Sequence, residues 1–430
     1  MDRGNGLDSD CTYYSGGPLL INITVPRVVG DVAKLKAAHY ISPMAHLRLP
    51  AFDVDMFGDP ADSAAPPEVD RVTFNGHDLG TLTGDNDIWK LNEFTIPIEW
   101  INFPSAGADG VAPIPGDNEL RIDIDTYSGG DDNWCTSVDW AELDFDAIAP
   151  IFLVHGILSN GSAAWPNFHT AFTEAGIPFS DSINLPGRGT IEGNAVVLAQ
   201  RLTALATSLG ARKCHIIAHS KGGLDSRAYL NGTYNADRLR VLSLYTVSTP
   251  HHGTVIADMG IAVEEQLPTL SLTRLFLTRL LPFVADLSTS SMAAFNARYP
   301  TVPTGVLAYA VGADADGNSD KQIDTGEAID LPAGLSKPAI ATYFYQTLAT
   351  EATMRVTSNR PTIWGDTSGI VIDVMPTSGF AKNDVLVSTA SATAPFGTYL
   401  GDRVGNHTTV KSTDLARTIL QQIIADYPNR

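Results

Sequence analysis

The chain has 430 residues, of which 44% are hydrophobic and 18% charged, so it can bury a sizeable core and form two domains. The 48 Asp and Glu residues outnumber the 28 Lys and Arg residues, which gives a formal net charge of −20. This balance disfavours sequence-general binding of nucleic acid and of anionic lipid headgroups. We interpret the charge as an ordinary solvated acidic surface.

The cysteines indicate the cellular compartment. Cys11 and Cys135 lie in polar segments rich in Gly and Asp, whereas Cys214 belongs to an apolar run typical of a buried strand. A Cys11–Cys135 disulfide is therefore favoured, and it would imply an oxidising compartment and a secreted protein. No run of eighteen apolar residues provides an integral membrane anchor. The first residues, MDRGNGLDSDC, have no apolar signal core, so we expect that a secretory signal was removed before them.

Residues 1–147 are predicted to form an all-β sandwich, an accessory domain. Alternating runs such as LLINITVP and ELRIDIDT are separated by dense turn signals such as TGDND and PGDNE. We find no catalytic cluster in this segment. Its tryptophans either form the core, as aromatic residues in small sandwiches mostly do, or present a binding surface. They are Trp89, Trp100, Trp134 and Trp140.

Residues 148–430 are predicted to form the catalytic domain, with an α/β fold. Strand-like runs alternate with amphipathic helical runs such as GNAVVLAQRLTALATSLG, which indicates a mostly parallel sheet. The run CHIIAH is apolar almost throughout, as in a strand that helices cover on both faces. We therefore expect a doubly wound sheet.

The strongest chemical signal is Ala218-His219-Ser220-Lys221-Gly222, between the strand CHIIAH and the helical run GLDSRAYL. A sharp strand-to-helix turn holds a nucleophile in a strained backbone conformation, so the residues two before and two after it must be small. Ala218 and Gly222 meet this demand, and we predict that Ser220 is the nucleophile of an α/β-hydrolase. The dipole of the following helix would favour an oxyanion at this point.

A second signal, His155-Gly156-Ile157, follows the apolar strand IFLV, where the oxyanion loop of such a fold is expected. The backbone N–H groups of Ile157 and Lys221 are predicted to bind the oxyanion of a tetrahedral intermediate. His155 is expected to shape the loop rather than to transfer protons. We place His155 and His219 in the substrate pocket.

The nucleophile needs a base, and the base needs a carboxylate. The histidines after the elbow are His251, His252 and His407. His407 lies in a late polar loop, where the base belongs, whereas His251 and His252 come too early and are expected to form part of the pocket wall. Asp384, which follows an apolar strand, is the favoured acid. Asp402 is the competing candidate, with a role in a turn as its alternative.

At these residues the sequence resembles the true bacterial lipases of the Pseudomonas and Burkholderia group. The resemblance implies an ester-hydrolysing enzyme with a Ser220, Asp384, His407 triad and a mobile helical lid. The calcium-binding Asp of that family is replaced by Thr409, and residues 1–147 have no counterpart in it. The similar stretches are HGI at 155–157, AHSKGG at 218–223, STPHHGT at 248–254 and NDVLVS at 383–388, together with DLSTSSMAAFNARYP before the last strands.

A different calcium loop is a candidate at residues 316–327. Its oxygen-bearing side chains follow the spacing of an EF-hand loop, although Lys321 replaces the usual glycine and no helix pair flanks the loop. A structural calcium ion and a solvated acidic turn therefore both stay open, and no cofactor is expected for catalysis. The candidate ligands are Asp316, Asn318, Asp320, Asp324 and Glu327.

Residues 258–300 are predicted to contain the lid. The run IAVEEQLPTLSLTRLFLTRLLPFVAD is apolar on nearly every helical face, so something must cover it. It is either a lid whose opening exposes an acyl pocket, with Leu275 and Phe276 in that pocket, or an ordinary core helix.

Together these features predict a secreted, monomeric serine hydrolase of carboxylic esters whose substrate is apolar or insoluble. Lipid esters are the favoured substrate, and insoluble aliphatic polyesters such as polylactide are the alternative. A non-catalytic protein that binds lipids or surfaces is the alternative of another class, which the complete triad disfavours. Peptide and thioester hydrolysis use the same catalytic parts and stay open.

Overall fold

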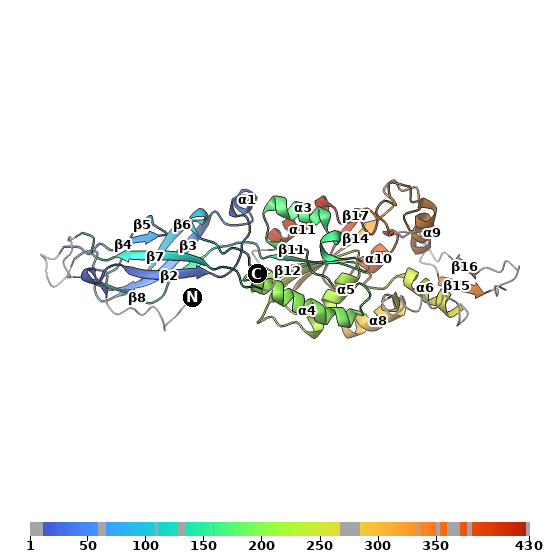
Figure 1. The fold of residues 1–430 in the computed structure, drawn as a ribbon, viewed down its shortest axis with the longest axis horizontal. Helices are drawn as coiled ribbons and strands as arrows, with labels where there is room; N and C mark the ends of the chain where they lie inside the picture. Colours follow the sequence, from blue (N-terminus) through green and yellow to red (C-terminus); the bar gives the residue numbers. More distant parts are fainter. Residues whose placement is uncertain are drawn as a thin grey trace. The chain divides into compact units, whose positions relative to one another are not determined.

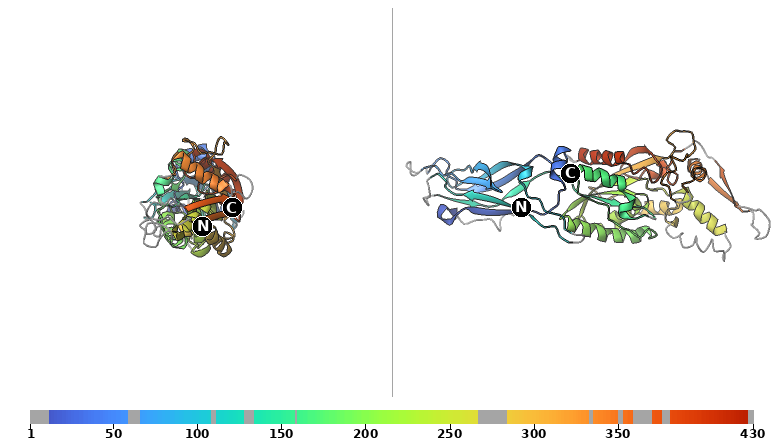
Figure 2. Two further views of the ribbon diagram at one scale, coloured as in Figure 1. Left: turned by 90° about the vertical axis from the view of Figure 1, so that its right-hand side faces the viewer. Right: turned by 45° about the horizontal axis from the view of Figure 1, so that its top comes forward.

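The computed structural model describes residues 12–58, 66–107, 111–127, 134–157, 159–266, 284–332, 335–349, 353–358, 370–375 and 381–426. The chain divides into two compact units (Figures 1 and 2). The first comprises residues 1–149 with the short segments 175–178 and 207–211, and the second comprises the rest.

The first unit contains two antiparallel sheets. One has the strand order β2-β7-β4-β5, and the other has the order β1-β8-β3-β6 with β9 paired to β3. The strands are β1 (Thr12–Tyr13), β2 (Leu19–Val25), β3 (Met44–Phe52), β4 (Arg71–Phe74), β5 (His77–Thr81), β6 (Trp89–Pro97), β7 (Gly116–Asp123), β8 (Cys135–Val138) and β9 (Glu142–Asp144). The short helical segments are η1 (Tyr14–Gly16), α1 (Val32–Ala37) and η2 (Ile98–Trp100).

Side chains alternate between buried and more exposed positions along the longer strands. In β3 the buried positions include Ala45, Leu47 and Leu49, and in β7 they include Leu120 and Ile122. This period of two gives each sheet one apolar face, because successive residues of a strand point to opposite sides. Packing of the two sheets as a sandwich stays a prediction.

The aromatic residues of this unit differ in their surroundings. Trp134 is buried, and Trp100 stacks on His77 with ring centroids 4.1 Å apart. Trp89 is 50% exposed, and its ring centroid lies 5.2 Å from that of Phe52. Trp134 therefore belongs to the core, whereas Trp89 contributes to the surface.

The cysteines fall into two classes. Cys135 is disulfide-bonded, and Cys214 is a buried free thiol. Burial raises the pKa of the Cys214 thiol well above its usual range, so this thiol stays protonated. Cys11, the predicted partner of Cys135, lies outside the described residues.

The second unit is organised around a six-stranded sheet of order β11-β10-β12-β13-β14-β17. All neighbouring strands run parallel, as the sequence predicts. The central strands β12 and β13 are buried at every position after their first residue, because the sheet is covered on both faces. The strands are β10 (Ile151–Val154), β11 (Phe179–Ser180), β12 (Lys213–His219), β13 (Arg240–Val247), β14 (Leu307–Asp314) and β17 (Thr398–Val404).

Helices cover this sheet on both sides. In Figures 1 and 2, α3 (Pro166–Ala175) and α11 (Thr413–Ala425) lie on one face, and α4 (Ile191–Ser208) and α5 (Lys221–Gly232) lie on the other. This is the doubly wound arrangement that alternating strands and helices predict. The other helices in the described residues of this unit are α2 (Gly161–Ala164), α6 (Val255–Gln266), α8 (Thr289–Arg298), α9 (Pro338–Ala349) and α10 (Thr389–Ala392).

Two further strands, β15 (Thr353–Ser358) and β16 (Ile370–Met375), form an antiparallel pair separate from the main sheet. Within the described residues, no helix has the length and hydropathy needed to cross a membrane.

Candidate active site

Ser220 lies in the turn between β12 and α5 in a strained backbone conformation. Its φ and ψ angles are 55° and −134°, a region that residues with a side chain rarely adopt. Its backbone N–H donates to the carbonyl oxygen of Val247, 2.9 Å away, which ties the turn to the neighbouring strand. The turn directs the serine away from the strand at the carboxyl edge of the sheet, as a nucleophile elbow does.

Small residues around the turn are required by contact with β10 and the loop that follows it. A Cβ at Gly222 would stand 2.4 Å from the carbonyl oxygen of His155, and one at Gly156 would stand 2.6 Å from Cβ of Ser220. Real Cβ atoms essentially never come this close to other heavy atoms. The small-residue rule that identified the elbow in the sequence therefore has a direct steric cause in this structure.

The side chains of Ser220, His407 and Asp384 form one hydrogen-bonded chain. Nε2 of His407 lies 2.9 Å from Oγ of Ser220, and Nδ1 of His407 lies 2.7 Å from Oδ2 of Asp384. The carboxylate can only accept, so Nδ1 carries the proton and Nε2 offers its lone pair to the serine hydroxyl. The three side chains predicted as the triad are thus brought together, with the histidine in the tautomer that a general base needs.

The acid is held in place by its own loop. Oδ1 of Asp384 accepts hydrogen bonds from the backbone N–H groups of Leu386 and Val387, at 2.9 and 2.7 Å. Val385 has a φ angle of 79°, which is unusual for a β-branched residue and marks a strained turn. The side-chain amide of Asn383 donates to the carbonyl oxygen of Tyr345 at 3.0 Å, so α9 fixes the start of this turn.

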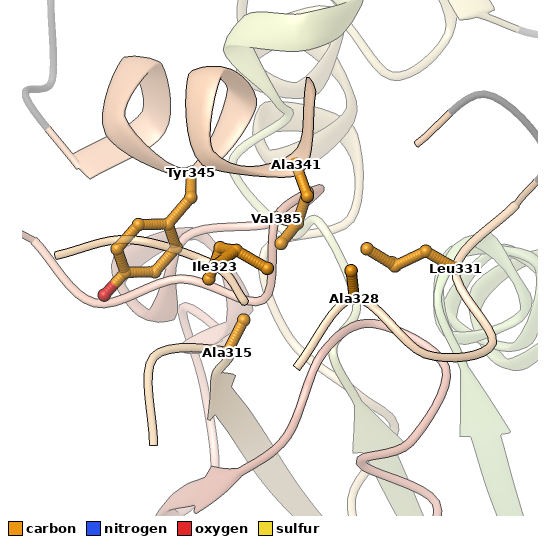
Figure 3. Close-up of a cluster of buried hydrophobic side chains, with 7 residues drawn as sticks. All are labelled: Ala315, Ile323, Ala328, Leu331, Ala341, Tyr345 and Val385. Atoms are coloured by element: carbon orange, nitrogen blue, oxygen red, sulfur yellow. The ribbon is translucent and has the colours of Figure 1, made fainter. Parts of the chain in front are cut away.

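A cluster of buried apolar side chains anchors the same loop (Figure 3). Val385 is fully buried in it and packs with side chains of α9 and of the segment after β14. The strain at Val385 is therefore opposed by apolar burial. The cluster consists of Ala315, Ile323, Ala328, Leu331, Ala341, Tyr345 and Val385.

The loop that carries His407 is fixed by the preceding asparagine. Nδ2 of Asn406 donates to the carbonyl oxygens of Glu327 and Ile329, both at 2.7 Å. Its Oδ1 accepts from the backbone N–H of Thr408 at 2.8 Å. This loop and the acid loop are also joined directly, because the N–H of His407 donates to the carbonyl oxygen of Asp384 at 2.9 Å.

Asp402, the competing candidate for the acid, has other partners. Its Oδ1 accepts a hydrogen bond from the hydroxyl of Tyr399, and its Oδ2 lies 3.8 Å from Nζ of Lys382. The carboxylate that His407 contacts belongs to Asp384. The geometry therefore assigns the acid to Asp384.

His155 and His251, which we placed in the substrate pocket, are buried structural residues, so that placement was wrong. Nε2 of His155 accepts from the N–H of Leu185 at 3.0 Å, and its Nδ1 donates to the carbonyl oxygen of Gly156 at 2.7 Å. His251 is fully buried, with its Nδ1 3.0 Å from the guanidinium of Arg227. Burial lowers the pKa of both histidines, which favours neutral rings.

The predicted oxyanion donors lie on the two segments that flank the nucleophile. Ile157 lines the cleft beside Ser220, and Lys221 is the first residue of α5. The N–H groups of a helix's first turn have no acceptor within the helix, so that of Lys221 can serve a substrate oxygen. The Lys221 side chain turns inward and donates to Oδ1 of Asp225 at 2.7 Å, both residues being buried.

Ser220 and His407 open into a cleft of about 690 Å³. One part of its wall is apolar, and another part is polar. The apolar part includes Ile157, Ala163, Ala164, Pro166, Pro332 and Leu386. The polar part includes Ser159, Asn167, Asp330, Thr408, Thr409 and Lys411, and His219 lines the cleft as predicted.

Lys411 is a residue of the site that the sequence did not predict. This residue lies four positions after the base His407 and is only 8% exposed, although it lines the cleft. Its burial was not evident from the sequence, because a lysine just before a helix is usually solvated. Asn167 was also missed, and its amide donates to the carbonyl oxygen of Lys411 at 3.1 Å.

The candidate calcium loop does not gather its ligands around a common point. Within the described residues, no group of three or more His, Cys, Asp or Glu side chains is arranged to hold a metal ion. The carboxylates accept backbone hydrogen bonds instead: Oδ2 of Asp316 from the N–H of Lys321 at 2.8 Å, and Oε1 of Glu327 from that of Gly317 at 2.7 Å. The described loop has the hydrogen bonds of an acidic turn, a bound calcium ion stays a prediction, and we derive no catalytic step from calcium.

Much of the predicted lid, including Leu275 and Phe276, lies outside the described residues. The described end of this segment, α8, is tied to the domain around it. Asn296 of α8 donates to the carbonyl oxygen of His251 at 2.8 Å, and its Oδ1 accepts from Arg227 at 3.0 Å. These contacts attach α8 to the core, and a lid stays a prediction for the residues before it.

The parallel sheet, the strained serine at its carboxyl edge and the hydrogen-bonded triad define the second unit as an α/β-hydrolase fold. No family model matches the chain. Over 124 residues it is 34% identical to triacylglycerol lipase 2 of Saccharomyces cerevisiae. This stretch covers 28% of the chain and only 36% of the yeast protein.

Several solved structures are similar to the chain at low identity. A mature lipase of Bacillus licheniformis is 19% identical with a TM-score of 0.45, over 64% of this chain and 91% of that one. A metagenomic carboxyl esterase is 19% identical with a TM-score of 0.41, over 65% and 75% of the two chains. Lipase 1 of Pelosinus fermentans is 14% identical with a TM-score of 0.42, over 64% and 98%.

Proposed function

We propose that the protein is a secreted serine hydrolase that cleaves carboxylic esters through an acyl-enzyme on Ser220. The observation that carries this proposal is the chain from Oγ of Ser220 through His407 to Asp384, with distances of 2.9 and 2.7 Å, opening into the cleft. The yeast relative that shares a stretch of sequence with the chain is a triacylglycerol lipase, which supports an ester as the substrate.

In the first half of the reaction, Nε2 of His407 takes the proton of Ser220 as Oγ forms a bond to the ester carbonyl carbon. The carbonyl oxygen becomes an oxyanion, which the N–H groups of Ile157 and Lys221 stabilise. His407 then gives its proton to the alkoxide oxygen, the carbon–oxygen bond of the ester breaks, and the alcohol leaves. Asp384 keeps His407 in the required tautomer and stabilises the transient imidazolium.

The second half uses the same groups on water. His407 takes a proton from a water molecule, whose oxygen attacks the acyl carbon. As the second tetrahedral intermediate collapses, the proton returns to Oγ of Ser220 and the carboxylic acid is released. No metal ion or cofactor takes part in either half of this scheme.

The substrate is proposed to be an apolar ester. The cleft of about 690 Å³ is large enough for an acyl chain, and its apolar wall beside Ser220 suits one. Lipid esters and aliphatic polyesters such as polylactide both meet this description. Exposed Trp89 in the first unit offers apolar surface through which an insoluble substrate could be held.

Secretion is supported by the disulfide at Cys135, because such bonds persist in oxidising compartments. The net charge of −20 gives no attraction to nucleic acid. We propose that the protein acts as a monomer.

The test compares the wild type with Ser220→Ala and with the control Ser182→Ala, an exposed serine of the same unit. Substrates are p-nitrophenyl esters of increasing chain length, emulsified triglyceride and a polylactide emulsion. A fluorophosphonate, which labels only an activated serine, reports the nucleophile without any choice of substrate.

We expect labelling and ester turnover in the wild type and the control, and neither in Ser220→Ala. Activity that rises with chain length and on emulsions indicates a lipase, whereas short-chain preference with clearing of polylactide indicates a polyesterase. Turnover retained by Ser220→Ala would refute the assignment of the nucleophile. Absence of both labelling and turnover in the wild type would favour a non-catalytic surface-binding protein.

A further inference from the structure

Lys411 is a buried cation beside the catalytic histidine that the proposed mechanism does not use. It is the one Lys or Arg among the described residues that line the cleft, since the side chain of Lys221 faces inward to Asp225. Its Nζ lies 3.4 Å from Nδ1 of His219 and 5.9 Å from the centre of the Trp165 ring. Burial lowers the pKa of Lys411 to about 8, and the nearby carboxylate of Asp384 opposes this effect.

His219 connects this cation to the backbone of the base. Its Nε2 lies 2.7 Å from the carbonyl oxygen of His407. A carbonyl can only accept, so Nε2 carries the proton and donates. Burial is the main cause that lowers the pKa of His219 well below its usual value, with the charge of Lys411 as a further cause. The ring is therefore neutral, and its Nδ1 is left with a lone pair that accepts from Lys411.

Two chains of hydrogen bonds thus meet at His407. The side chain is oriented by Asp384, which binds Nδ1 at 2.7 Å. The main chain is oriented by His219, whose ring also packs against the His407 ring with centroids 4.7 Å apart. The opposite tautomer of His219 would place a lone pair against the carbonyl oxygen of His407 and break the second chain.

We propose that Lys411 is a positioning residue for the hydrolytic reaction: its ammonium fixes the tautomer of His219, which holds the backbone of His407 so that Nε2 stays in line with Oγ of Ser220. The inference rests on the proposed function, since it concerns the same base. Lys411 acts through His219 and does not touch the reacting atoms.

The arrangement predicts a dependence on pH. His219 contacts Lys411, and the charges of Asp384 and Lys411 and of His155 and Lys411 interact. His407 and Asp330 are the other titratable residues that line the cleft beside Lys411. When Lys411 loses its proton near pH 8, the neutral amine can accept as well as donate, and only the carbonyl oxygen of His407 then favours the productive tautomer of His219. The turnover number should therefore fall above pH about 8 in the wild type.

The experiment uses the full chain and four variants. Lys411→Met removes the cation at similar volume, and Lys411→Arg keeps a cation whose pKa lies far above the assay range. His219→Phe removes the donor to His407, and His219→Gln keeps a nitrogen donor near the position of Nε2. Lys213→Met, an exposed lysine at the start of β12, is the matched control.

The readouts are kcat and KM on a neutral p-nitrophenyl ester from pH 6 to 10, and the rate at which a fluorophosphonate labels Ser220. Lys411→Met should lower kcat and the labelling rate about tenfold with little change in KM, and the fall above pH 8 should disappear. Lys411→Arg should recover part of kcat and move the fall to higher pH. His219→Gln should retain more activity than His219→Phe.

Two further measurements separate positioning from loss of structure. The double variant Lys411→Met/His219→Phe should be no slower than His219→Phe alone, because both changes break one chain. Lys411→Met should also melt at a higher temperature than the wild type at pH 7, since it removes a charge that is costly to bury. A slower but more stable enzyme cannot owe its lost activity to unfolding.

The inference is overturned if Lys411→Met behaves like Lys213→Met, if its effect adds fully to that of His219→Phe, or if the loss is confined to KM for esters that carry a free carboxylate. The last outcome would make Lys411 a substrate anchor instead. Failure of the proposed function gives a different result, because the wild type would then neither hydrolyse esters nor be labelled at Ser220.

Discussion

Gly156 lies directly against the nucleophile: a β-carbon at this position would stand 2.6 Å from Cβ of Ser220 and 3.1 Å from its Oγ. Gly156→Ala should therefore displace the serine or its turn, and a displacement of about 1 Å at a reacting atom can cost on the order of 100-fold in rate. We expect kcat/KM on p-nitrophenyl butyrate to fall by about this factor. The protein should stay folded by circular dichroism.

The matched control is Gly232→Ala at the end of α5, where nothing lies within 4 Å of the added carbon. It should leave kcat/KM unchanged. Equal activity of Gly156→Ala and the wild type would contradict this prediction. It would show that the loop after β10 can shift to make room for the methyl group without displacing Ser220.

The choice between the two candidate acids gives a second prediction. Asp384→Asn should lower kcat about 10⁴-fold, because an amide nitrogen facing Nδ1 of His407 favours the wrong tautomer. Asp402→Asn should change kcat less than about threefold, since its partners are Tyr399 and Lys382. Steady-state kinetics of both variants decide the matter, and the reverse ranking would move the acid to Asp402.

Much of this site could be predicted from the sequence because its chemistry depends on local patterns. The strand, turn and helix around Ser220 are consecutive in the chain, and small residues at Ala218 and Gly222 are the local pattern of a nucleophile elbow. Chain order then left few histidines and carboxylates to choose from. The parallel sheet followed from alternating strands and helices in the same way.

Contacts between distant segments could not be predicted in this way. His155 and His251 were placed in the pocket because they stand at strand ends, yet their hydrogen bonds to Leu185 and Arg227 hold them in the core. The burial of Lys411 depends on packing against Trp165 and His219, far away in sequence. The spacing of the oxygen-bearing side chains predicts a calcium loop. The hydrogen bonds that its carboxylates accept from backbone N–H groups depend on the conformation of the loop, which spacing does not give.

Chelation tests that loop. Because Asp316 and Glu327 already accept backbone hydrogen bonds, EDTA should leave both the melting temperature and kcat unchanged, and added Ca²⁺ should do the same. Asp316→Asn should have a small effect for the same reason. A drop in melting temperature on chelation that Ca²⁺ reverses, and that Asp316→Asn abolishes, would instead show a bound ion that rearranges the loop.

The first unit contains a buried acid pair, Glu68 and Asp70, which gives a prediction on pH and stability. Both are almost fully buried, and the hydroxyl oxygen of Thr136 lies within hydrogen-bond distance of a carboxyl oxygen of each. Burial is the main cause that raises the pKa of Glu68 to about 9, and repulsion from Asp70 adds to it. Glu68 therefore keeps its proton in the folded protein at neutral pH but loses it on unfolding.

The sign of the effect follows from this difference in proton binding. Between the ordinary glutamate pKa of 4.5 and the folded value of about 9, the folded state holds a proton that the unfolded state has released. The contribution of Glu68 to stability is thus fully present below pH 4.5 and is lost as pH rises toward 9, by at most about 1.4 kcal/mol per pH unit. Glu68→Gln, which imitates the protonated acid and cannot titrate, removes this loss.

We therefore expect Glu68→Gln to stabilise the first unit at pH 8 and to have little effect at pH 4. Hydrogen exchange of the amides of β4 and β8 in the full chain measures this locally, because slower exchange in the variant at pH 8 reports a higher opening free energy. Glu119→Gln, an exposed glutamate of β7, removes the same charge from the same unit and should not slow exchange. Faster exchange of Glu68→Gln at pH 8 would contradict this prediction. It would show that Glu68 is ionised in the folded protein and that hydrogen bonds to its carboxylate stabilise the first unit.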